Sequence, residues 1–456
     1  MASPTLQTIP EDLLVEIFLR LTTLAALACS AAACTSFRCL IKGRVFRHRF
    51  RSLHRPPLLG FMDAAGFHPI EAPDPSAPLA GSLTPCAEDF SFVPPVFSSS
   101  SYLFSVSSYF PIGLMPREED LPRWRPRDAR DGRVLLDWVS LHLRSIHMWR
   151  NPEDGHDVSV LMDCNEMPYN VAATHATWTK RERCNVADFH LAVCDPLSHI
   201  YELLPTIPED LAASPEERLF EFVPMLAPAS AIEDDVSFKV ICMAKYQTKF
   251  VLFFFISTPT TKKWRMATFP IFNPLGGLSC FDCVRGYFYW TNLWVGLLVL
   301  DTRTMMFSII GLFTGYHVQL KDLPHLSIGR RRRLSAIVVG TEGAVEMISL
   351  VGQDGSFTFH HTSLQNDSHE WKLDKIIPLP GQYDDYSISI VGAAEGFLFF
   401  QCTPQGINGD NVDGYSLDVK TYEITKVCSK KEIPGFKPKH ALPYFSFPPF
   451  LSDPTI

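Results

Sequence analysis

Few side chains in this sequence are grouped in a way that could support chemistry. His360 and His361 are adjacent, and two short acidic patches lie at Glu233–Asp235 and Gln382–Asp385. Imidazole and carboxylate groups bind metal ions and act as general acids and bases. No ligand spacing or catalytic partner accompanies them, so we interpret these groups as surface residues rather than as a site.

The common catalytic motifs do not occur either. The sequence has no GxSxG, HExxH, GxGxxG or GxxxxGKS/T motif, and His369-Glu370 is followed by Trp-Lys-Leu where a zinc protease would place a second His. Cys280-Phe-Asp-Cys283 is a CxxC pair, but no second pair follows at the spacing of a zinc site. We therefore expect a protein that is not an enzyme and holds no metal ion or other cofactor.

Length, charge and hydropathy limit the remaining classes of protein. The chain has 456 residues, of which 46% are hydrophobic, and its net charge is -8, which disfavours a nucleic-acid-binding surface. The longest apolar runs, Val251–Ile256 and Leu293–Leu300, are too short to cross a membrane. Acidic residues precede the apolar segment Leu21–Cys34, which is atypical of a secretion signal. Twelve scattered cysteines indicate reduced thiols and a cytoplasmic or nuclear location.

The first 60 residues differ from the rest of the chain. They hold eight Lys or Arg against three Asp or Glu, a net charge of +5, whereas the remainder holds 33 and 46, a net charge of -13. Thr8 and Glu11 have the spacing of a capping box, with Pro10 in the first turn of the helix. One apolar stripe follows at helical spacing, formed by Leu13, Leu14, Ile17, Phe18 and Leu21. With further helices at 24–34 and 37–41, we expect a three-helix unit over residues 1–43.

A basic connecting segment is expected over residues 44–60. Lys and Arg side chains cluster around Phe46, Phe50 and Leu53, which recur at helical spacing until Pro56 and Pro57 end the helix. A nucleic-acid contact is the alternative, but no nucleic-acid-binding motif accompanies the charge, so we interpret the segment as a helix that joins two domains. The run Arg330–Arg333 is interpreted as a solvated turn, with nuclear import or contact with an acidic partner as the alternatives.

Residues 9–21, Ile-Pro-Glu-Asp-Leu-Leu-Val-Glu-Ile-Phe-Leu-Arg-Leu, resemble the opening of the F-box, the motif that docks on the Skp adaptor of cullin-RING ubiquitin ligases. The second half, 33–41, keeps a Cys, an aromatic residue and Arg-x-Leu-Ile, but Phe37 replaces the commoner Trp and Thr35 the commoner Lys or Arg. The resemblance implies an adaptor-binding surface made by Ile9, Pro10, Leu13, Leu14, Ile17, Leu21, Phe37, Leu40 and Ile41. A helical cap folded onto the chain's own large domain is the alternative.

The rest of the chain has the pattern of an all-β domain. Residues 61–132 are rich in Pro and Ser, with 11 Pro between Pro69 and Pro126, so irregular loops are expected there. From residue 133 to 456, short apolar runs alternate with turn residues. They predict strands at 134–136, 189–194, 238–243, 250–256, 287–290, 296–300, 336–339, 345–350, 387–391 and 396–401.

Three of these runs end alike, each with an Asp three residues before a Ser or Thr: Asp195, Asp301 and Asp418. An Asp at the first corner of a tight turn accepts hydrogen bonds from backbone N–H groups, so each predicts a hairpin. Asp137 repeats the spacing, and looser counterparts lie near 257 and 365. The spacing of these units fits four-stranded propeller blades, so we expect a β-propeller of six to eight blades, with an array of β-sandwiches as the alternative.

The segment Leu191–Pro205, together with the basic helix and Pro56-Pro57-Leu-Leu-Gly-Phe after the F-box-like unit, resembles plant F-box proteins with an F-box-associated β-propeller. That resemblance implies a substrate receptor: the helices dock a Skp-type adaptor, and through it a cullin, while the propeller binds a protein target that one sequence does not identify. Two alternatives remain, a propeller enzyme or carbohydrate-binding propeller with a helical cap, and an F-box scaffold that acts outside a ligase. Neither a nucleic acid nor a membrane is expected as a partner.

Overall fold

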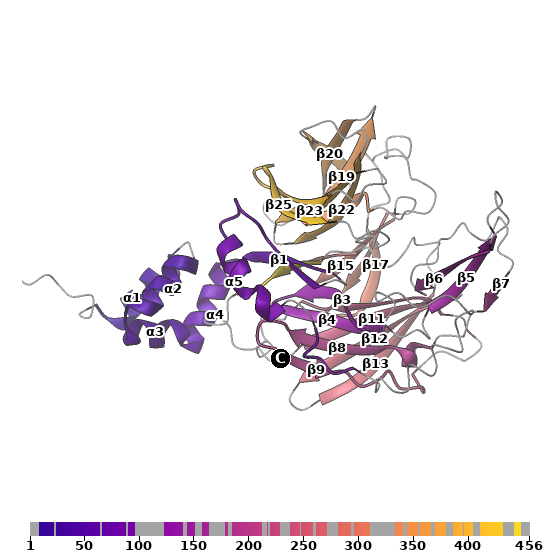
Figure 1. Ribbon diagram of the computed structural model, residues 1–456, viewed down its shortest axis with the longest axis horizontal. Coiled ribbons are helices and arrows are strands. Elements are labelled where there is room, and N and C mark those ends of the chain that lie inside the picture. Colours follow the sequence, from indigo (N-terminus) through magenta and orange to yellow (C-terminus); the bar gives the residue numbers. More distant parts are fainter. Residues whose placement is uncertain are drawn as a thin grey trace, which may run out of the picture.

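The computed structural model shows an N-terminal group of helices attached to one end of a β-propeller (Figure 1). The structure describes residues 9–21, 24–63, 66–87, 90–95, 123–139, 144–150, 157–163, 178–180, 185–211, 217, 219–228, 238–246, 248–258, 261–270, 281–292, 296–310, 333–340, 344–353, 356–365, 370–379, 386–394, 396–404, 411–431 and 442–447.

The N-terminal helices are α1 (Glu11–Leu19), α2 (Leu24–Ala33), α3 (Thr35–Lys42) and α4 (Arg44–Leu53). We call these four helices the helical module. Pro10 is the N-cap of α1 and its carbonyl accepts from the N–H groups of Leu13 and Leu14, so the expectation that Pro10 lies in the first turn is wrong. Thr8, the other half of the expected capping box, lies outside the described residues. None of the helices that the structure describes is long and apolar enough to cross a membrane.

Gly43 separates α3 from α4 with an extended backbone, φ -61° and ψ 136°. Helix α4 ends at His54, whose backbone is also extended, because the Pro56-Pro57 pair that follows cannot continue a helix. The helix predicted to join the two domains is thus present, and the first strand begins directly after the prolines, at Leu58.

Six antiparallel sheets form the blades of the propeller, which confirms the predicted fold. We number the blades along the chain. Blade 1 consists of β26 (Leu442–Phe445), β1 (Leu58–Asp63) and β2 (Gly66–Pro69); blade 2 of β3 (Arg123–Arg130), β4 (Arg133–Val139), β8 (His190–Asp195) and β9 (Ile200–Leu203); blade 3 of β10 (Leu219–Leu226), β11 (Phe238–Tyr246), β12 (Lys249–Thr258) and β13 (Thr261–Pro270). Blade 4 consists of β14 (Asp282–Val284), β15 (Tyr287–Asn292), β16 (Gly296–Asp301) and β17 (Met306–Ile310); blade 5 of β18 (Ser335–Val339), β19 (Val345–Gln353), β20 (Ser356–Leu364) and β21 (Trp371–Pro378); blade 6 of β22 (Tyr386–Ala394), β23 (Phe397–Pro404), β24 (Asn411–Asp418) and β25 (Ile424–Lys431).

Blade 1 closes the ring by pairing the two ends of the domain. The C-terminal strand β26 pairs with β1, with Leu58 opposite Phe445, and β1 pairs in turn with β2. Helix α5 (Ala77–Ala87) packs against β1 and β2 of this three-stranded blade. Closure by strands from both ends leaves the ring without an open edge between its first and last blades.

This closure fixes where the helical module sits. In an antiparallel blade, the turns that join the first strand to the second and the third to the fourth lie at the same end of the propeller. In blade 1, β26 takes the place of the first strand and β1 that of the second. No turn joins them, because the chain enters the blade at β1 and leaves it at β26. The helical module therefore lies at the end of the propeller that carries these hairpin turns, and a sheet of β5 (Arg144–Arg150), β6 (Asp157–Asp163) and β7 (Trp178–Lys180) lies at the far side of the molecule (Figure 1).

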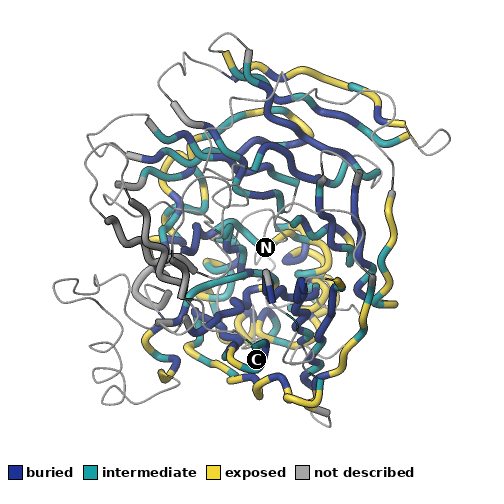
Figure 2. Tube along the Cα trace, turned by 90° about the vertical axis from the view of Figure 1, so that its right-hand side faces the viewer, coloured by how far each residue is buried: buried dark blue, intermediate teal, exposed yellow. Residues whose placement is uncertain are grey.

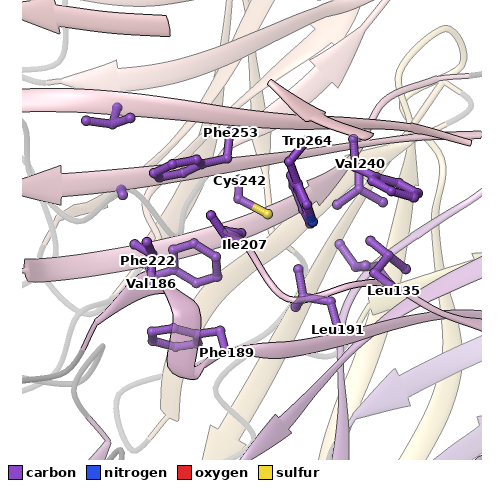
Figure 3. Close-up of a cluster of buried hydrophobic side chains, with 14 of the residues drawn as sticks. Leu135, Val186, Phe189, Leu191, Ile207, Phe222, Val240, Cys242, Phe253 and Trp264 are labelled. Atoms are coloured by element: carbon purple, nitrogen blue, oxygen red, sulfur yellow. The ribbon is translucent and has the colours of Figure 1, made fainter. Parts of the chain in front are cut away.

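The core of the propeller lies between neighbouring blades. Leu135 and Leu191 of blade 2 face Phe222, Cys242 and Phe253 of blade 3 in one buried cluster (Figure 3). Buried residues follow the strands of the blades through the molecule (Figure 2). Continuous apolar runs such as 250–256 form strands because both faces of a blade are covered by its neighbours.

The Asp turns are hairpins at three of the four positions where the spacing occurs. The carboxylate of Asp418 accepts from the N–H groups of Lys420 and Thr421, and Asp195 makes the two equivalent bonds. Asp301 accepts from the Arg303 N–H, which corresponds to the first of these bonds. Four residues after each Asp, the chain adopts a positive φ, at His199, Met305 and Tyr422. The expectation at Asp137 is wrong: it lies inside β4, where its carboxylate pairs with Arg127 instead of capping a turn.

Candidate functional site

The exposed face of α1 is the surface on which the sequence analysis placed an adaptor. Leu13 is 56% exposed and Ile17 is 48% exposed, and Pro10 is exposed at the start of the same helix. The three residues recur at i, i+3 and i+7, so they lie on one side of the helix. Together they give this side of the helix an exposed apolar surface.

The opposite side of α1 builds the core of the helical module. Leu14 and Phe18 are buried, and the Phe18 ring meets Phe37 of α3 edge to face at 5.1 Å between ring centroids. Ile41 of α3 is fully buried in the same cluster, which also includes Phe46 and Phe50 of α4. Of the nine residues proposed to bind an adaptor, Leu14, Phe37 and Ile41 therefore lie inside the module; Ile9, Leu21 and Leu40 are half-buried at its edge; Pro10, Leu13 and Ile17 are exposed.

Local hydrogen bonds hold α3 in position under α1. The Phe37 N–H donates to the Sγ atom of Cys34, the N-cap residue of α3, at 3.4 Å. The Arg38 Nε–H donates to the Ala31 carbonyl at 3.2 Å, which joins α3 to the end of α2. Phe37, which is 9% exposed, is thus a packing residue of the module core.

Helix α4 connects the helical module to the propeller. Its Phe50 ring lies 6.1 Å from Phe447, a residue that follows the last strand of blade 1 and joins the core of the helical module. The Ser446 N–H donates to the Pro57 carbonyl at 3.3 Å, and the Arg55 guanidinium lies close to Gly396 in the first turn of blade 6. The C-terminal end of the chain thus packs against the helices as well as closing the ring.

Sequence reasoning did not identify Phe447 as part of this arrangement. The only signal for it is an aromatic run, Tyr444 to Phe447, that continues past the end of the last strand. Such a run predicts burial but does not say against what, because the contacts of Phe447 lie almost 400 residues away in sequence.

Two buried carboxylates on inner strands of the propeller, Asp128 and Asp282, bond to the neighbouring blade. Asp128 of β3 accepts from the Leu226 N–H of blade 3 at 2.9 Å and pairs with Arg130 at 3.1 Å. Asp282 of β14 accepts from the Ile337 N–H of blade 5 at 2.8 Å and pairs with Arg333. Burial raises the pKa of both carboxyls, and the paired arginines oppose that shift.

These carboxylates join neighbouring blades. In each case the acid lies on the innermost strand of one blade and bonds to the backbone of the innermost strand of the next. Beside them, burial raises the pKa of the Cys283 thiol to about 11, although Arg130 opposes the shift, so the thiol is protonated at neutral pH. The hydrogen bonds and ion pairs of the two acids thus stabilise the ring.

A second polar cluster lies between blades 5 and 6. The His361 Nε2 atom lies 2.7 Å from the Glu346 carboxylate, and its Nδ1 atom lies 2.9 Å from the Tyr422 hydroxyl. The Lys375 ammonium lies 3.9 Å from the centre of the Tyr422 ring. Burial and the nearby Glu346 raise the pKa of Tyr422, so its phenol stays protonated and joins the two blades through His361.

Other groups singled out by the sequence contribute no site in the described part of the chain. The patches Glu233–Asp235 and Gln382–Asp385, together with Cys280, His369 and residues 330–332, lie outside the described residues. Within the described ranges, no three His, Cys, Asp or Glu side chains are placed so that they could hold a metal ion.

Together, the fold and the exposed helix face define a six-bladed β-propeller with an N-terminal helical module. No family model matches the sequence, and no curated protein matches it either. Solved structures are similar at low identity. A puromycin hydrolase is 11% identical with a TM-score of 0.30, and the match covers 69% of this chain and 46% of the hydrolase. The NanB sialidase of Streptococcus pneumoniae is 8% identical with a TM-score of 0.31 (67% of this chain, 54% of the sialidase), and the WD40 domain of SCAP from fission yeast is 8% identical with a TM-score of 0.31 (70% of this chain, 92% of that domain). The chain spans about half the length of the first two structures.

Proposed function

We propose that this protein is a substrate receptor of an SCF-type (Skp, cullin, F-box) ubiquitin ligase. Its helical module would dock a Skp-type adaptor, which binds a cullin, and its propeller would hold a protein target. The chain itself would carry out no chemistry. Such a receptor would act in the cytoplasm or the nucleus.

The observation that carries this proposal is the exposed pair Leu13 and Ile17. Both lie in the segment that resembles the F-box, on the helix that the resemblance assigns to the adaptor. The core of the helical module is complete without them, because Leu14, Phe18 and Phe37 already fill it. The two side chains thus offer an apolar surface, on the segment that resembles the F-box, which an adaptor would cover.

The position of the helical module supports a receptor that works by proximity. Phe447 and the contacts around Arg55 hold the module against one end of the propeller, so an adaptor bound to α1 would stand at a defined orientation to the blades. In this proposal the target binds on the propeller, away from the helical module. Holding a target there raises the effective concentration of its lysines near the conjugating enzyme of the ligase.

The polar clusters favour this function over an enzyme. A catalytic propeller would need carboxylates that face a substrate, but Asp128 and Asp282 are each bonded to an arginine and to the next blade. The His361 cluster likewise holds two blades together. An F-box scaffold that works outside a ligase shares the adaptor contact and differs only in whether a cullin joins the complex.

The test is a pull-down of a recombinant Skp-type adaptor, with and without a cullin, by the full chain. We compare the wild type with a Leu13→Asp/Ile17→Asp variant and with Met306→Asp, a control at a residue that is 60% exposed on blade 4. The proposal predicts that the wild type and the control bind the adaptor and recruit cullin, and that the double variant binds neither. Failure of the wild type to bind would overturn it, and adaptor binding without cullin recruitment would favour the scaffold.

A further inference from the structure

Helix α4 also exposes apolar side chains. Val45 is 76% exposed and Leu53 is 65% exposed, which makes them the most exposed large apolar residues of the described helices. With Arg49 they recur at i, i+4 and i+8, so the three residues form one stripe along the helix. The buried residues of α4, Phe46 and Phe50, pack into the core of the helical module and leave this stripe outside it.

Two contacts place the stripe beside α1. Arg49 of α4 pairs with Glu16 of α1 at 2.6 Å, and the His54 Nε2 atom lies 2.7 Å from the Leu19 carbonyl at the end of α1. Higher residue numbers in α1 thus meet higher residue numbers in α4, so the two helices lie side by side and run in the same direction. Counting back one turn from Glu16 and Arg49 brings Leu13 level with Val45.

The exposed side of α1 and the stripe of α4 are therefore continuous across the Glu16–Arg49 pair. A partner that covers Leu13 would reach Val45 without leaving the surface of the helical module. Because both residues of the ion pair are about half exposed, the pair gives little stability to the module itself and is free to exchange partners on docking.

The charge of α4 defines the chemistry of what covers it. The helix contains four arginines and one histidine and no acidic residue, and Glu16 is the carboxylate that α1 turns towards it. A complementary surface combines apolar side chains, which cover Val45 and Leu53, with carboxylates, which face Arg44 and Arg49.

We propose that the adaptor-binding surface extends from α1 onto α4, where an acidic and apolar segment of the same adaptor covers Val45, Arg49 and Leu53. This inference rests on the function proposed above. It adds that the adaptor contacts the helix that connects the module to the propeller. Through Phe50 and Phe447, the bound adaptor would then fix the orientation of the blades as well as that of the module.

The experiment measures binding of a recombinant Skp-type adaptor to the full chain by biolayer interferometry at low and high salt. The apolar variants are Val45→Ala and Leu53→Ala, with Val45→Asp as the stronger change; these positions are exposed in the free chain, and circular dichroism checks that each variant folds. Losing the apolar contact should weaken binding about tenfold for Val45→Asp. An Arg44→Glu variant should slow association at low salt, with a smaller effect at high salt.

Two results separate this inference from the proposed function. If the wild type binds, Leu13→Asp weakens binding about tenfold or more and all the α4 variants bind as the wild type does, the proposed function stands and the extension onto α4 is wrong. If the wild type itself does not bind the adaptor, both are wrong. Weaker binding by the α4 variants, with Met306→Asp unchanged, supports the extension.

Discussion

Replacing Phe447 with Ala should loosen the helical module without opening the propeller. The Phe447 side chain is 7% exposed, packs edge to face on Phe50 and lies 6.0 Å from the Arg51 guanidinium. Truncating a buried Phe to Ala costs about 3 to 5 kcal/mol, which includes the cavity that remains. Because the ring sits at the border of the module core, we expect the lower end of that range, about 3 kcal/mol.

Hydrogen exchange followed by mass spectrometry measures this loss where it occurs. At about 1.4 kcal/mol for each tenfold change, 3 kcal/mol should speed the exchange of amides in α1, α3 and α4 by roughly a hundredfold. Amides in the inner strands of blades 3 to 5 should exchange as in the wild type, since they do not contact Phe447.

Phe445→Ala is the matched control, two residues earlier in the same segment. Phe445 belongs to the propeller side, where its ring lies 6.0 Å from Phe399 of blade 6. Its truncation should speed exchange in blades 1 and 6 rather than in the helices. If Phe447→Ala left the helices protected as in the wild type, the idea that the C-terminal segment anchors the module would be refuted.

Two further predictions concern the interior of the propeller. Burial raises the pKa of the Cys283 thiol from 9.0 to about 11, so the folded state holds this proton more tightly than the unfolded chain. The resulting stability is present below pH 9 and is lost as the pH rises towards 11. Chemical denaturation at pH 8, 9, 10 and 11 should therefore show a falling free energy of unfolding. A Cys283→Ser variant that lost the same free energy over this range would contradict that assignment. Gly340→Ala should destabilise the fold by about 1 to 3 kcal/mol, because the new Cβ would displace the Glu346 carboxylate that His361 contacts. Its control is Gly81→Ala in α5, where nothing lies within 4 Å of the new Cβ. This variant should stabilise the fold by up to about 1 kcal/mol. Equal thermal shifts for the two variants would count against that explanation.

The repeated features of the propeller were predictable from sequence because they are local. Asp195, Asp301 and Asp418 act within four residues of chain, so their spacing was enough to predict the hairpins. Asp137 has the same spacing but lies within β4, where its carboxylate pairs with Arg127 on the neighbouring strand. Local spacing alone does not distinguish the two cases.

Features that depend on distant parts of the chain were not predictable. The pairing of β26 with β1 joins residues almost 400 positions apart, and with it the number of blades is fixed at six. At the candidate site, helical periodicity predicted the apolar stripe of α1 but not its division into a buried and an exposed side. Which residues of α1 are buried depends on what packs against the helix, and the cluster that buries Leu14 and Phe18 includes residues of α3 and the distant Phe447.

The central claim, that the exposed side of α1 binds a Skp-type adaptor, is tested most directly by isothermal titration calorimetry of the adaptor into the full chain. Leu13 and Ile17 are each about half exposed, so covering them should contribute about 1 to 1.5 kcal/mol apiece, and losing both corresponds to a factor of roughly 30 to 150 in affinity. We predict measurable binding by the wild type, at least that loss for Leu13→Asp/Ile17→Asp, and no change for Met306→Asp. Binding of the double variant with wild-type affinity, or no binding by the wild type, would contradict the account.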